Sequence, residues 1–355
     1  MADFRRTRLV LAAPDAFKGT AAASEIAAAV AIAARDAGWA CDECPLADGG
    51  EGFADVVSAA ADGAGRWIET TVTGPLGRPV VARWYLASGQ AVIESATASG
   101  LPLAGGSAGN DPVGATSRGT GELIAAAVAA GARRILIGVG GSATTDGGLG
   151  AVEAIDESGG LADTEVVVAC DVETLFVDAA YVFGPQKGAS AAQIVVLRRR
   201  LEALAARYRV ERGVDVSSLT RAGAAGGLAG GLAVLGARLV PGFDVVADAV
   251  SLVERIGRAD LVVTGEGRLD ASSWSGKVVG GVRTRARSAG VPLLVVAGTV
   301  GAGGPQSGLE VVDLSDRFGP APAMADPAAC VREVVREALE HRPLDKPSSG
   351  ENVGR

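Results

Sequence analysis

Short apolar runs alternate with polar loops along most of this chain, in the pattern of a parallel α/β fold. Apolar runs at 8–13, 134–137, 165–169 and 260–263 have the length and composition of buried strands. Loops rich in glycine and charged residues follow these runs, and alanine-rich helical stretches follow several of the loops. Strand, loop and helix in this order predict a parallel sheet, in which ligands gather at the carboxyl ends of the strands.

The pattern changes between residues 67 and 94, where β-branched and aromatic residues replace the alanine-rich helices. Turn signals at 74–75 and 88–89 divide this stretch into segments of strand length. The composition predicts antiparallel strands joined by hairpins, so we expect a second domain to begin here. Residues 344–355 are polar and have no apolar face, which predicts a disordered tail.

The strand at 134–137 runs into a glycine-rich loop, and the whole stretch reads RILIGVGGSATTDGGLG. Glycines with positive φ bring successive backbone amides close together, and such amides form a concave site for an anion, usually phosphate. Ser142 and the two threonines add neutral donors, and Asp146 could hold a metal or orient a nucleophile. The alternative is a glycine-rich turn that is packed tightly for steric reasons alone.

Two other nucleotide-binding motifs need to be weighed. Residues 138–143 fit G-x-G-x-x-A after a strand, and Asp156 lies near the spacing expected of a ribose-binding acid, as in NAD enzymes. However, TTDGG follows where the helix of that motif should begin, which disfavours NAD. A Walker A motif is absent, because the stretch from Gly267 to Lys277 is too long and unlike it.

Charge and composition exclude several classes of protein. The 355 residues suffice for about two domains. A net charge of −8 argues against nucleic acid or an anionic membrane as the main partner. The longest uncharged stretch, 222–237, is short for a membrane span, so we expect a cytoplasmic protein. Cys41 and Cys44 have redox or zinc spacing, but without a second pair they indicate reduced, structural cysteines.

The single histidine, His341, lies close to the polar tail. Ser-His-Asp hydrolysis, histidine-based zinc sites and histidine-dependent dehydrogenation are therefore disfavoured. Acid–base or metal chemistry must fall to carboxylates and lysines. Phosphoryl transfer needs this set of residues, because carboxylates hold Mg²⁺, Lys and Arg neutralise phosphate oxygens, and backbone amides cradle the rest.

Six motifs in this order then carry a specific resemblance, namely APDAFKGT, PLADGGEG, GGSATTDGG, ACDV, FGPQKGA and TGEGRLD followed by GK. With these six motifs together, the chain resembles the type-I glycerate kinases. The resemblance implies phosphorylation of D-glycerate with ATP and Mg²⁺, commonly to 2-phosphoglycerate. It also implies a Rossmann-like α/β domain (1–66 and 241–343) with a mixed α/β domain (67–240) inserted in it, and an active site in the cleft between them. We expect a monomer or homodimer.

The motif matches supply the candidate site residues. Lys18 and Lys187 are expected on phosphate or on the glycerate carboxylate, and Glu266 and Asp270 on the metal or as the base, with Asp48 as the competitor. Each could equally make a hydrogen bond that only fixes its loop. The catalytic candidates are Lys18, Asp48, Asp171, Glu266 and Asp270. The substrate- or phosphate-binding candidates are Gly49, Gly50, Glu51, Gly140, Gly141, Ser142, Asp146, Gly147, Gly148, Lys187, Arg268 and Lys277.

The chain also departs from the family pattern. Only about twenty residues separate GGLG from ACDV, Arg118 stands where an aromatic residue is expected, and no histidine precedes Gly276-Lys277. These departures bear on the acceptor more than on the reaction. The rival hypotheses are a kinase of another small hydroxy acid and a non-catalytic nucleotide- or metabolite-binding regulator. The many carboxylates in the candidate loops favour catalysis.

Overall fold

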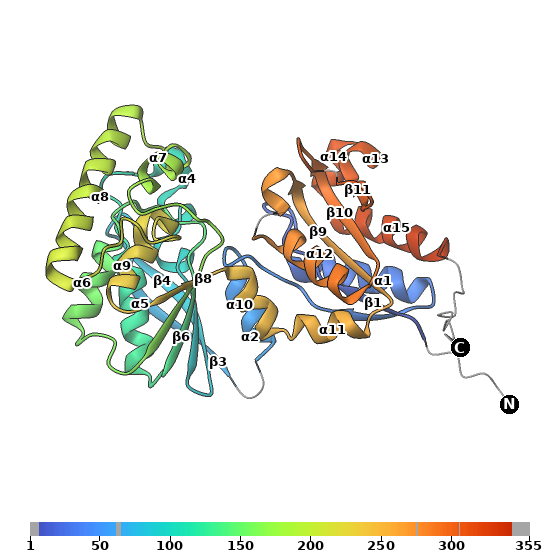
Figure 1. The fold of residues 1–355 in the computed structure, drawn as a ribbon, viewed down its shortest axis with the longest axis horizontal. Helices are drawn as coiled ribbons and strands as arrows, with labels where there is room; N and C mark the ends of the chain where they lie inside the picture. The colour runs from blue at the N-terminus through green and yellow to red at the C-terminus, as the bar shows by residue number, and fades with distance from the viewer. Residues whose placement is uncertain (1–6, 62–64, 275, 305, 343–355) are drawn as a thin grey trace, which may run out of the picture. The chain divides into compact units, whose positions relative to one another are not determined.

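The computed structural model describes residues 7–61, 65–274, 276–304 and 306–342, so the predicted tail at 344–355 lies outside the described residues. The chain forms two compact units (Figure 1). Unit 1 comprises 1–45, 254–271 and 282–355, and unit 2 comprises 46–253 and 272–281. The domain boundaries at 66/67 and 240/241 stay a prediction.

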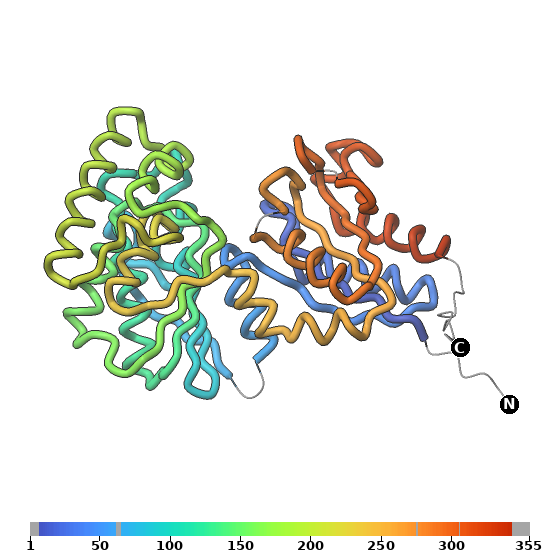
Figure 2. Tube along the Cα trace, in the orientation of Figure 1, coloured from blue at the N-terminus to red at the C-terminus, as the bar shows by residue number. Residues whose placement is uncertain are grey.

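Unit 1 contains a parallel sheet, which within the described residues has the order β11-β10-β9-β1-β2. The N-terminal and C-terminal parts of the chain therefore lie side by side, as the blue and orange-red segments of Figure 2 show. The strands are β1 (Leu9–Ala12), β2 (Ala40–Glu43), β9 (Leu261–Leu269), β10 (Leu293–Val300) and β11 (Glu310–Asp313).

The sheet of unit 1 is apolar on both faces, as expected of a parallel sheet covered by helices. Val10 packs in one core with α1 (Ala23–Asp36) and α15 (Pro327–Glu340), while Leu11 points to the opposite face and is also fully buried. α12 (Val278–Ala289) lies over that opposite face (Figure 1). The remaining helices of this region are α11 (Leu252–Arg258), α13 (Leu314–Phe318) and α14 (Pro320–Ala325).

Unit 2 contains a mixed sheet, which within the described residues has the order β3-β4-β5-β6-β7-β8. β3, β4 and β5 are antiparallel, as the composition of residues 67–94 predicts, and β5 to β8 are parallel. The strands are β3 (Arg66–Thr73), β4 (Pro79–Ala87), β5 (Gln90–Glu94), β6 (Arg134–Gly138), β7 (Glu165–Ala169) and β8 (Arg238–Val240). The predicted fold of two α/β units is confirmed.

Helices cover both faces of the mixed sheet. α5 (Arg118–Ala129), α6 (Leu149–Glu157) and α9 (Leu228–Val234) share the main core of unit 2 with one face. α2 (Phe53–Ala59) contacts β4 and β5, and α10 (Gly242–Ala249) contacts β7 and α2. α7 (Ala179–Phe183) and α8 (Ala191–Arg212) form a further core with Phe176. The shorter pieces are α3 (Ala96–Ser99), η1 (Pro102–Ala104), α4 (Gly106–Gly109), η2 (Pro185–Lys187), η3 (Ala224–Gly227) and η4 (Ala271–Trp274).

The extent of β9 corrects the sequence-based prediction that the strand ends at Val263 and that 264–270 is a loop. The strand continues to Leu269, because Thr264 to Leu269 pair with Val295 to Val300 of β10. Glycines in this stretch suggested a loop, but Gly265 is needed for a different reason. A Cβ at Gly265 would lie 2.0 Å from the Val296 carbonyl oxygen, so only glycine fits between the paired strands.

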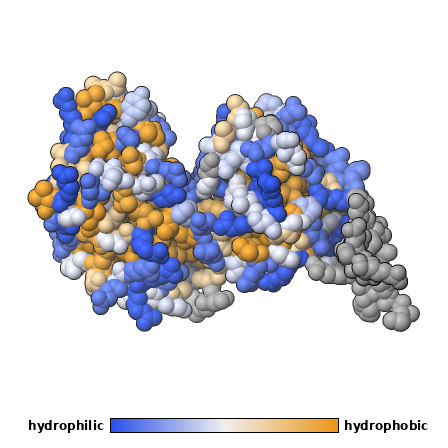
Figure 3. Space-filling view, viewed as in Figure 1, coloured by the Kyte–Doolittle hydropathy of each residue, from blue (hydrophilic) through white to orange (hydrophobic). Residues whose placement is uncertain are grey.

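Figure 3 shows hydrophobic residues interspersed with hydrophilic ones on the drawn face of each unit. Single exposed apolar residues such as Val210 and Val253 are ordinary for a folded domain. None of the helices in the described part of the chain is both long and apolar enough to cross a membrane.

Candidate active site

Four parallel strands of unit 2 deliver their polar residues to one edge of the mixed sheet. β5 ends at Glu94, β6 runs into the glycine loop (residues 138–148), β7 is followed by Cys170 and Asp171, and β8 by Pro241 and Gly242. Carboxyl ends of parallel strands are where α/β proteins place their ligands. The observed register therefore assembles candidates that lie far apart in the sequence.

The segment 48–52, which carries the DGGEG motif, packs directly onto this edge. A Cβ at Gly49 would lie 2.8 Å from the Ala169 carbonyl oxygen, and one at Gly242 would lie 2.3 Å from the Asp48 carbonyl oxygen. A Cβ at Gly140 would lie 2.5 Å from the Gly50 Cα. These glycines are required because three backbone segments approach one another more closely than any side chain allows.

The glycine loop turns sharply through three glycines with positive φ, at Gly141, Gly147 and Gly148. Gly147 and Gly148 also lie against α8 and α9, where a Cβ would come within 3.0 Å of their atoms. The positive φ values fit a loop whose amides bind an anion, and the close packing fits a turn that needs glycine for steric reasons. Its packing accounts for the glycines, and its amides remain candidates for phosphate.

Asp146 holds the glycine loop in place. Its carboxylate accepts hydrogen bonds from the N–H and hydroxyl of Ser117 (both 2.8 Å) and from the N–H of Gly148 (3.1 Å) and Gly150 (3.3 Å). These bonds occupy both carboxylate oxygens. The structure thus gives Asp146 a loop-fixing role, and its contact with substrate or metal stays a prediction.

Lys187 holds the loop from the other side. Its ammonium donates to the Ser142 hydroxyl (2.9 Å) and to the Thr144 carbonyl oxygen (2.5 Å), and the side chain is only 2% exposed. Burial lowers the pKa of Lys187 to about 7, against the attraction of Asp146, which raises it. The observed contacts of Lys187 are therefore within the protein, and the prediction that it binds phosphate or glycerate stays a prediction.

Asp171 has two properties of a reactive carboxylate, namely a buried oxygen without a hydrogen bond in the described part of the chain and a raised pKa. Its Oδ1 accepts hydrogen bonds from the N–H of Gly242 (2.7 Å) and of Phe243 (3.3 Å) at the start of α10. Its Oδ2 is buried and makes no hydrogen bond within the described residues. Burial and, to a smaller extent, the neighbouring Asp48 together raise the pKa of Asp171 to about 7. A carboxyl group that titrates near neutrality in a glycine-lined site is a candidate general base.

Asp48 lies close enough to Asp171 to interact with it electrostatically, and its Oδ1 accepts a hydrogen bond from the Gly50 N–H (3.1 Å). The Lys277 ammonium donates a hydrogen bond to the Ser272 hydroxyl (2.9 Å). A Cβ at the adjacent Gly276 would lie 3.8 Å from the Asp171 carbonyl oxygen. Unit 2 thus brings Asp48, Asp171 and the segment that carries Lys277 close together. Glu51, in the DGGEG segment, has an exposed side chain.

Glu94 lies at the same edge of the sheet and is not among the candidates that the motifs supply. Its Oε2 accepts a hydrogen bond from the Ala54 N–H (3.4 Å), directly after the DGGEG segment. Burial raises the pKa of Glu94 to about 7, with further contributions from Asp55 and Glu51. The only sequence signal was a polar residue at the end of an apolar strand. Its importance depends on the change from antiparallel to parallel pairing at β5, which local sequence does not reveal.

The raised pKa of Glu94 has a measurable consequence for stability. Between about pH 4.5 and 7 the unfolded chain loses the proton of Glu94 while the folded chain keeps it, so this residue destabilises the fold as pH rises. We expect Glu94→Gln to raise the free energy of unfolding by roughly 1–3 kcal/mol at pH 8 and to leave it nearly unchanged at pH 4. Urea denaturation at both pH values measures this difference. The exposed Glu69→Gln serves as the control, and an equal gain at both pH values would contradict the assignment.

Unit 1 carries the other candidates on β9 and in the loops that follow β1 and β9. The loop after β1 lies along β9, because the Asp15 N–H donates to the Gly265 carbonyl (2.9 Å) and Gly267 lies beside the Lys18 backbone. Glu266 and Arg268 are two residues apart on β9 and thus lie on one face of the strand. Glu266 is buried and Arg268 is exposed, with its Nε 3.6 Å from the Asp270 Oδ2. Lys18, Glu266, Arg268 and Asp270 thus lie on neighbouring segments of unit 1.

A protein-family model matches most of the chain. The model described as the glycerate kinase family matches residues 10–159 and 156–338. The chain belongs to the glycerate kinase family. It is accordingly a kinase, from an enzyme class that phosphorylates glycerate with ATP.

Individual members of the glycerate kinase family agree with this assignment. "Glycerate 2-kinase" of Escherichia coli K12 is 41% identical over 329 residues, covering 82% of this chain and 85% of that protein. "Glycerate kinase" of Bacillus subtilis 168 is 39% identical over 327 residues, covering 82% and 85%. A crystal structure from Salmonella typhimurium LT2, described as a candidate glycerate kinase 2, superposes with a TM-score of 0.78 at 35% identity, covering 94% and 98%.

Two departures from the glycerate kinase pattern have a structural account. The short connection after the glycine loop leads from α6 to β7 through residues 158–164 alone. Arg118 forms ion pairs with Glu122 (3.1 Å) and with Glu157 (2.5 Å), which link the first turn of α5 to the end of α6. Both changes lie on the helix layer that covers the sheet, and the carboxyl-end residues keep the family motifs.

Proposed function

We propose that this kinase transfers the γ-phosphoryl group of ATP to a hydroxyl group of D-glycerate, with 2-phosphoglycerate as the product. The observation that carries the proposal is the state of Asp171. One of its carboxylate oxygens is fixed by two backbone N–H groups, and the other is buried without a hydrogen-bond partner within the described residues. A carboxylate of this kind, with a pKa of about 7, suits the removal of a proton from an attacking hydroxyl.

In the proposed reaction, Asp171 Oδ2 accepts the proton of the glycerate 2-hydroxyl as its oxygen attacks the γ-phosphorus. The new O–P bond forms while the bond from the γ-phosphorus to the β,γ-bridging oxygen breaks, and ADP leaves with that oxygen. Amides of the glycine loop and of the DGGEG segment stabilise charge on the phosphate oxygens. The motif matches make Glu266, Asp270 and Asp48 alternative candidates for the base, and the burial of Asp171 favours Asp171.

We further propose that Lys18 and Arg268 bind anionic oxygens of the substrates, since both side chains are exposed at strand ends of unit 1. Lys187 and Asp146 act in the proposal by holding the glycine loop in its required shape. The choice of the 2-hydroxyl as the acceptor is supported by the name of the Escherichia coli relative, "Glycerate 2-kinase".

The carboxylates present fit Mg²⁺, which prefers oxygen donors and is usually held by one or two carboxylates together with substrate phosphates. Within the described residues there is no group of three or more His, Cys, Asp or Glu side chains that could hold a metal by itself. Glu266 and Asp270 are the proposed ligands, and a bound Mg²⁺ would neutralise charge on the phosphates of ATP. The Asp270 Oδ2 also lies 3.6 Å from the Arg268 Nε.

A coupled assay of ADP release tests the proposed function. With ATP and Mg²⁺, we expect turnover that depends on D-glycerate and is much weaker with L-glycerate, and phosphorus NMR should show 2-phosphoglycerate. Glu266→Gln should reduce turnover without loss of the fold. A product phosphorylated at the 3-hydroxyl would overturn the assigned position. Turnover only with another hydroxy acid would favour that rival kinase, and ATP binding without any turnover would favour a regulator.

A further inference from the structure

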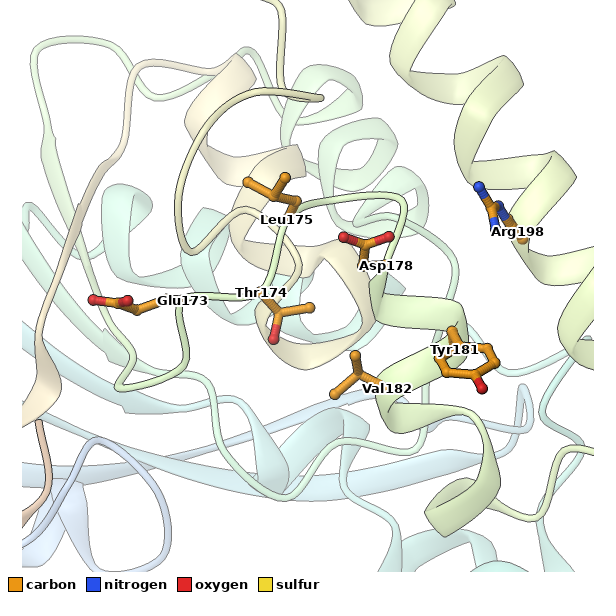
Figure 4. A pocket seen from close by; sticks show the side chains of 7 residues that line it. All are labelled: Glu173, Thr174, Leu175, Asp178, Tyr181, Val182 and Arg198. Carbon is orange, nitrogen blue, oxygen red and sulfur yellow. The ribbon is translucent and has the colours of Figure 1, made fainter. Parts of the chain in front are cut away.

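A surface pocket of unit 2 lies outside the residues assigned above. Its volume is about 410 Å³, within the range of pockets that bind small ligands. Three segments line it, namely the connection after β7, the helix α7 and one residue of α8 (Figure 4). Figure 4 shows Glu173 and Arg198 at opposite ends, with the apolar side chains between them.

The pocket exposes apolar and aromatic surface that the fold itself does not cover. Tyr181 is 72% exposed and Val182 50%, both in the short helix α7, and Leu175, in the connection before it, is 39% exposed. A tyrosine ring with aliphatic neighbours offers a surface on which a flat heteroaromatic ring can stack. This surface therefore fits a ligand with an aromatic ring.

The polar groups of the pocket select a donor-rich, uncharged ligand. Glu173 and Asp178 present carboxylates. The Glu173 carboxylate lies 3.7 Å from the Arg221 guanidinium, and the Asp178 carboxylate makes no hydrogen bond or ion pair within the described residues. The one cation of the lining, Arg198, is paired with Glu202 at 3.1 Å. Carboxylates repel a phosphate chain or glycerate but accept hydrogen bonds from ribose hydroxyls and from an amino group.

The pocket is connected to the glycine loop through one turn of the chain. The Gly223 N–H donates to the Thr174 carbonyl in the pocket lining (3.0 Å), and the Gly226 carbonyl accepts from the Gly147 N–H (3.0 Å). A Cβ at Gly226 would lie 2.0 Å from the Thr144 carbonyl oxygen, so this turn is in direct contact with the glycine loop. In sequence, the lining begins two residues after Asp171 and leads into the segment that carries Lys187.

We propose that this pocket binds the adenosine part of ATP, with the adenine ring on Tyr181, Leu175 and Val182 and the ribose hydroxyls on Asp178 and Glu173. The triphosphate would then extend toward the glycine loop. This inference rests on the proposed function in that it takes ATP as the phosphoryl donor. It adds the residues that bind the adenosine part of the nucleotide.

Steady-state kinetics and calorimetry on the full-length protein test the proposal. For Tyr181→Ala we expect KM for ATP and Kd for ADP to rise about tenfold, from the loss of base stacking, while kcat and KM for D-glycerate stay within about twofold. Tyr181→Phe keeps the ring and should bind ADP almost as wild type. Val196→Ala, an exposed position on α8 outside the pocket, is the matched control.

Inorganic triphosphate is the second probe, because it has the phosphates of ATP but no adenosine. Its Kd should be the same in wild type and Tyr181→Ala, since Tyr181 is proposed to bind adenine alone. Unchanged ADP affinity in Tyr181→Ala would overturn the adenosine site while leaving glycerate phosphorylation intact. Conversely, ADP binding that depends on Tyr181 in a protein without glycerate turnover would support the pocket and overturn the acceptor. Absence of ADP binding to the wild-type protein would overturn both.

Discussion

Replacing Asp171 by asparagine is expected to lower kcat for glycerate phosphorylation by about 10²–10⁴-fold, the usual contribution of a general base. Asparagine keeps an oxygen that accepts from the N–H groups of Gly242 and Phe243, so the local fold should survive. What it loses is the proton-accepting Oδ2, which is buried and makes no hydrogen bond within the described residues. Stopped-flow or steady-state measurement of ADP release, with circular dichroism as a check of folding, gives the result.

The pH profile distinguishes this role from a structural one. Because the pKa of Asp171 is raised to about 7, the wild-type kcat should fall as pH decreases below about 7 and should level off above it. Asp48→Asn removes one of the charges that raise this pKa, so it should move the inflection of the profile to lower pH. Glu94→Gln should leave the inflection in place. An Asp171→Asn variant with wild-type kcat would exclude Asp171 as the base.

Gly140→Ala is expected to reduce kcat/KM by about 100-fold or more and to lower the free energy of unfolding by roughly 1–3 kcal/mol. The added methyl group would lie 2.5 Å from the Gly50 Cα, and backbone on both sides cannot give way as a flexible side chain would. The glycine loop and the DGGEG segment must therefore separate, which displaces the amides proposed to hold phosphate. Kinetics and urea denaturation of the same preparation measure both effects.

Gly257→Ala provides the matched control for Gly140→Ala. This residue lies in α11 with nothing within 4 Å of the position that a Cβ would take. Alanine there should keep full activity and change stability by about 1 kcal/mol or less, in the stabilising direction. Full activity of Gly140→Ala would show that the two segments need not approach so closely, and the packing account of the site would be wrong.

Local sequence was sufficient to predict the fold class and much of the glycine-rich edge. The alternation of apolar runs with glycine loops identified the parallel strands, and the matched motifs identified Asp48 and Asp171 as candidate carboxylates. The β-branched composition of 67–94 also predicted the antiparallel part of the mixed sheet. These features depend on residues that are close in sequence, so pattern alone reveals them.

The remaining features depend on partners far away in the chain. The ammonium of Lys187 is buried because its acceptor, the Thr144 carbonyl, lies 43 residues earlier. β9 extends beyond its predicted end because β10 pairs with it, although the glycines favour a loop. Glu94 was missed because its significance arises only when β5 pairs with β6, whose partner residues lie 44 positions later in the chain (Glu94 with Gly138). In each case tertiary pairing overrides the local preference of the residues.

The pairing of β1 with β9 has a consequence for how the chain is made. Val10 pairs with Leu261, and the Leu9 N–H bonds to the Asp260 carboxylate at a sequence separation of 251 residues. During synthesis, β1 must therefore wait on the order of 10–50 seconds for its neighbour to leave the ribosome, at about 5–20 residues per second. Residues 46–253 of unit 2 emerge within that interval. The N-terminal segment, with its buried strand uncovered on one side, spends this time as the part of the nascent chain most exposed to chaperones and to aggregation.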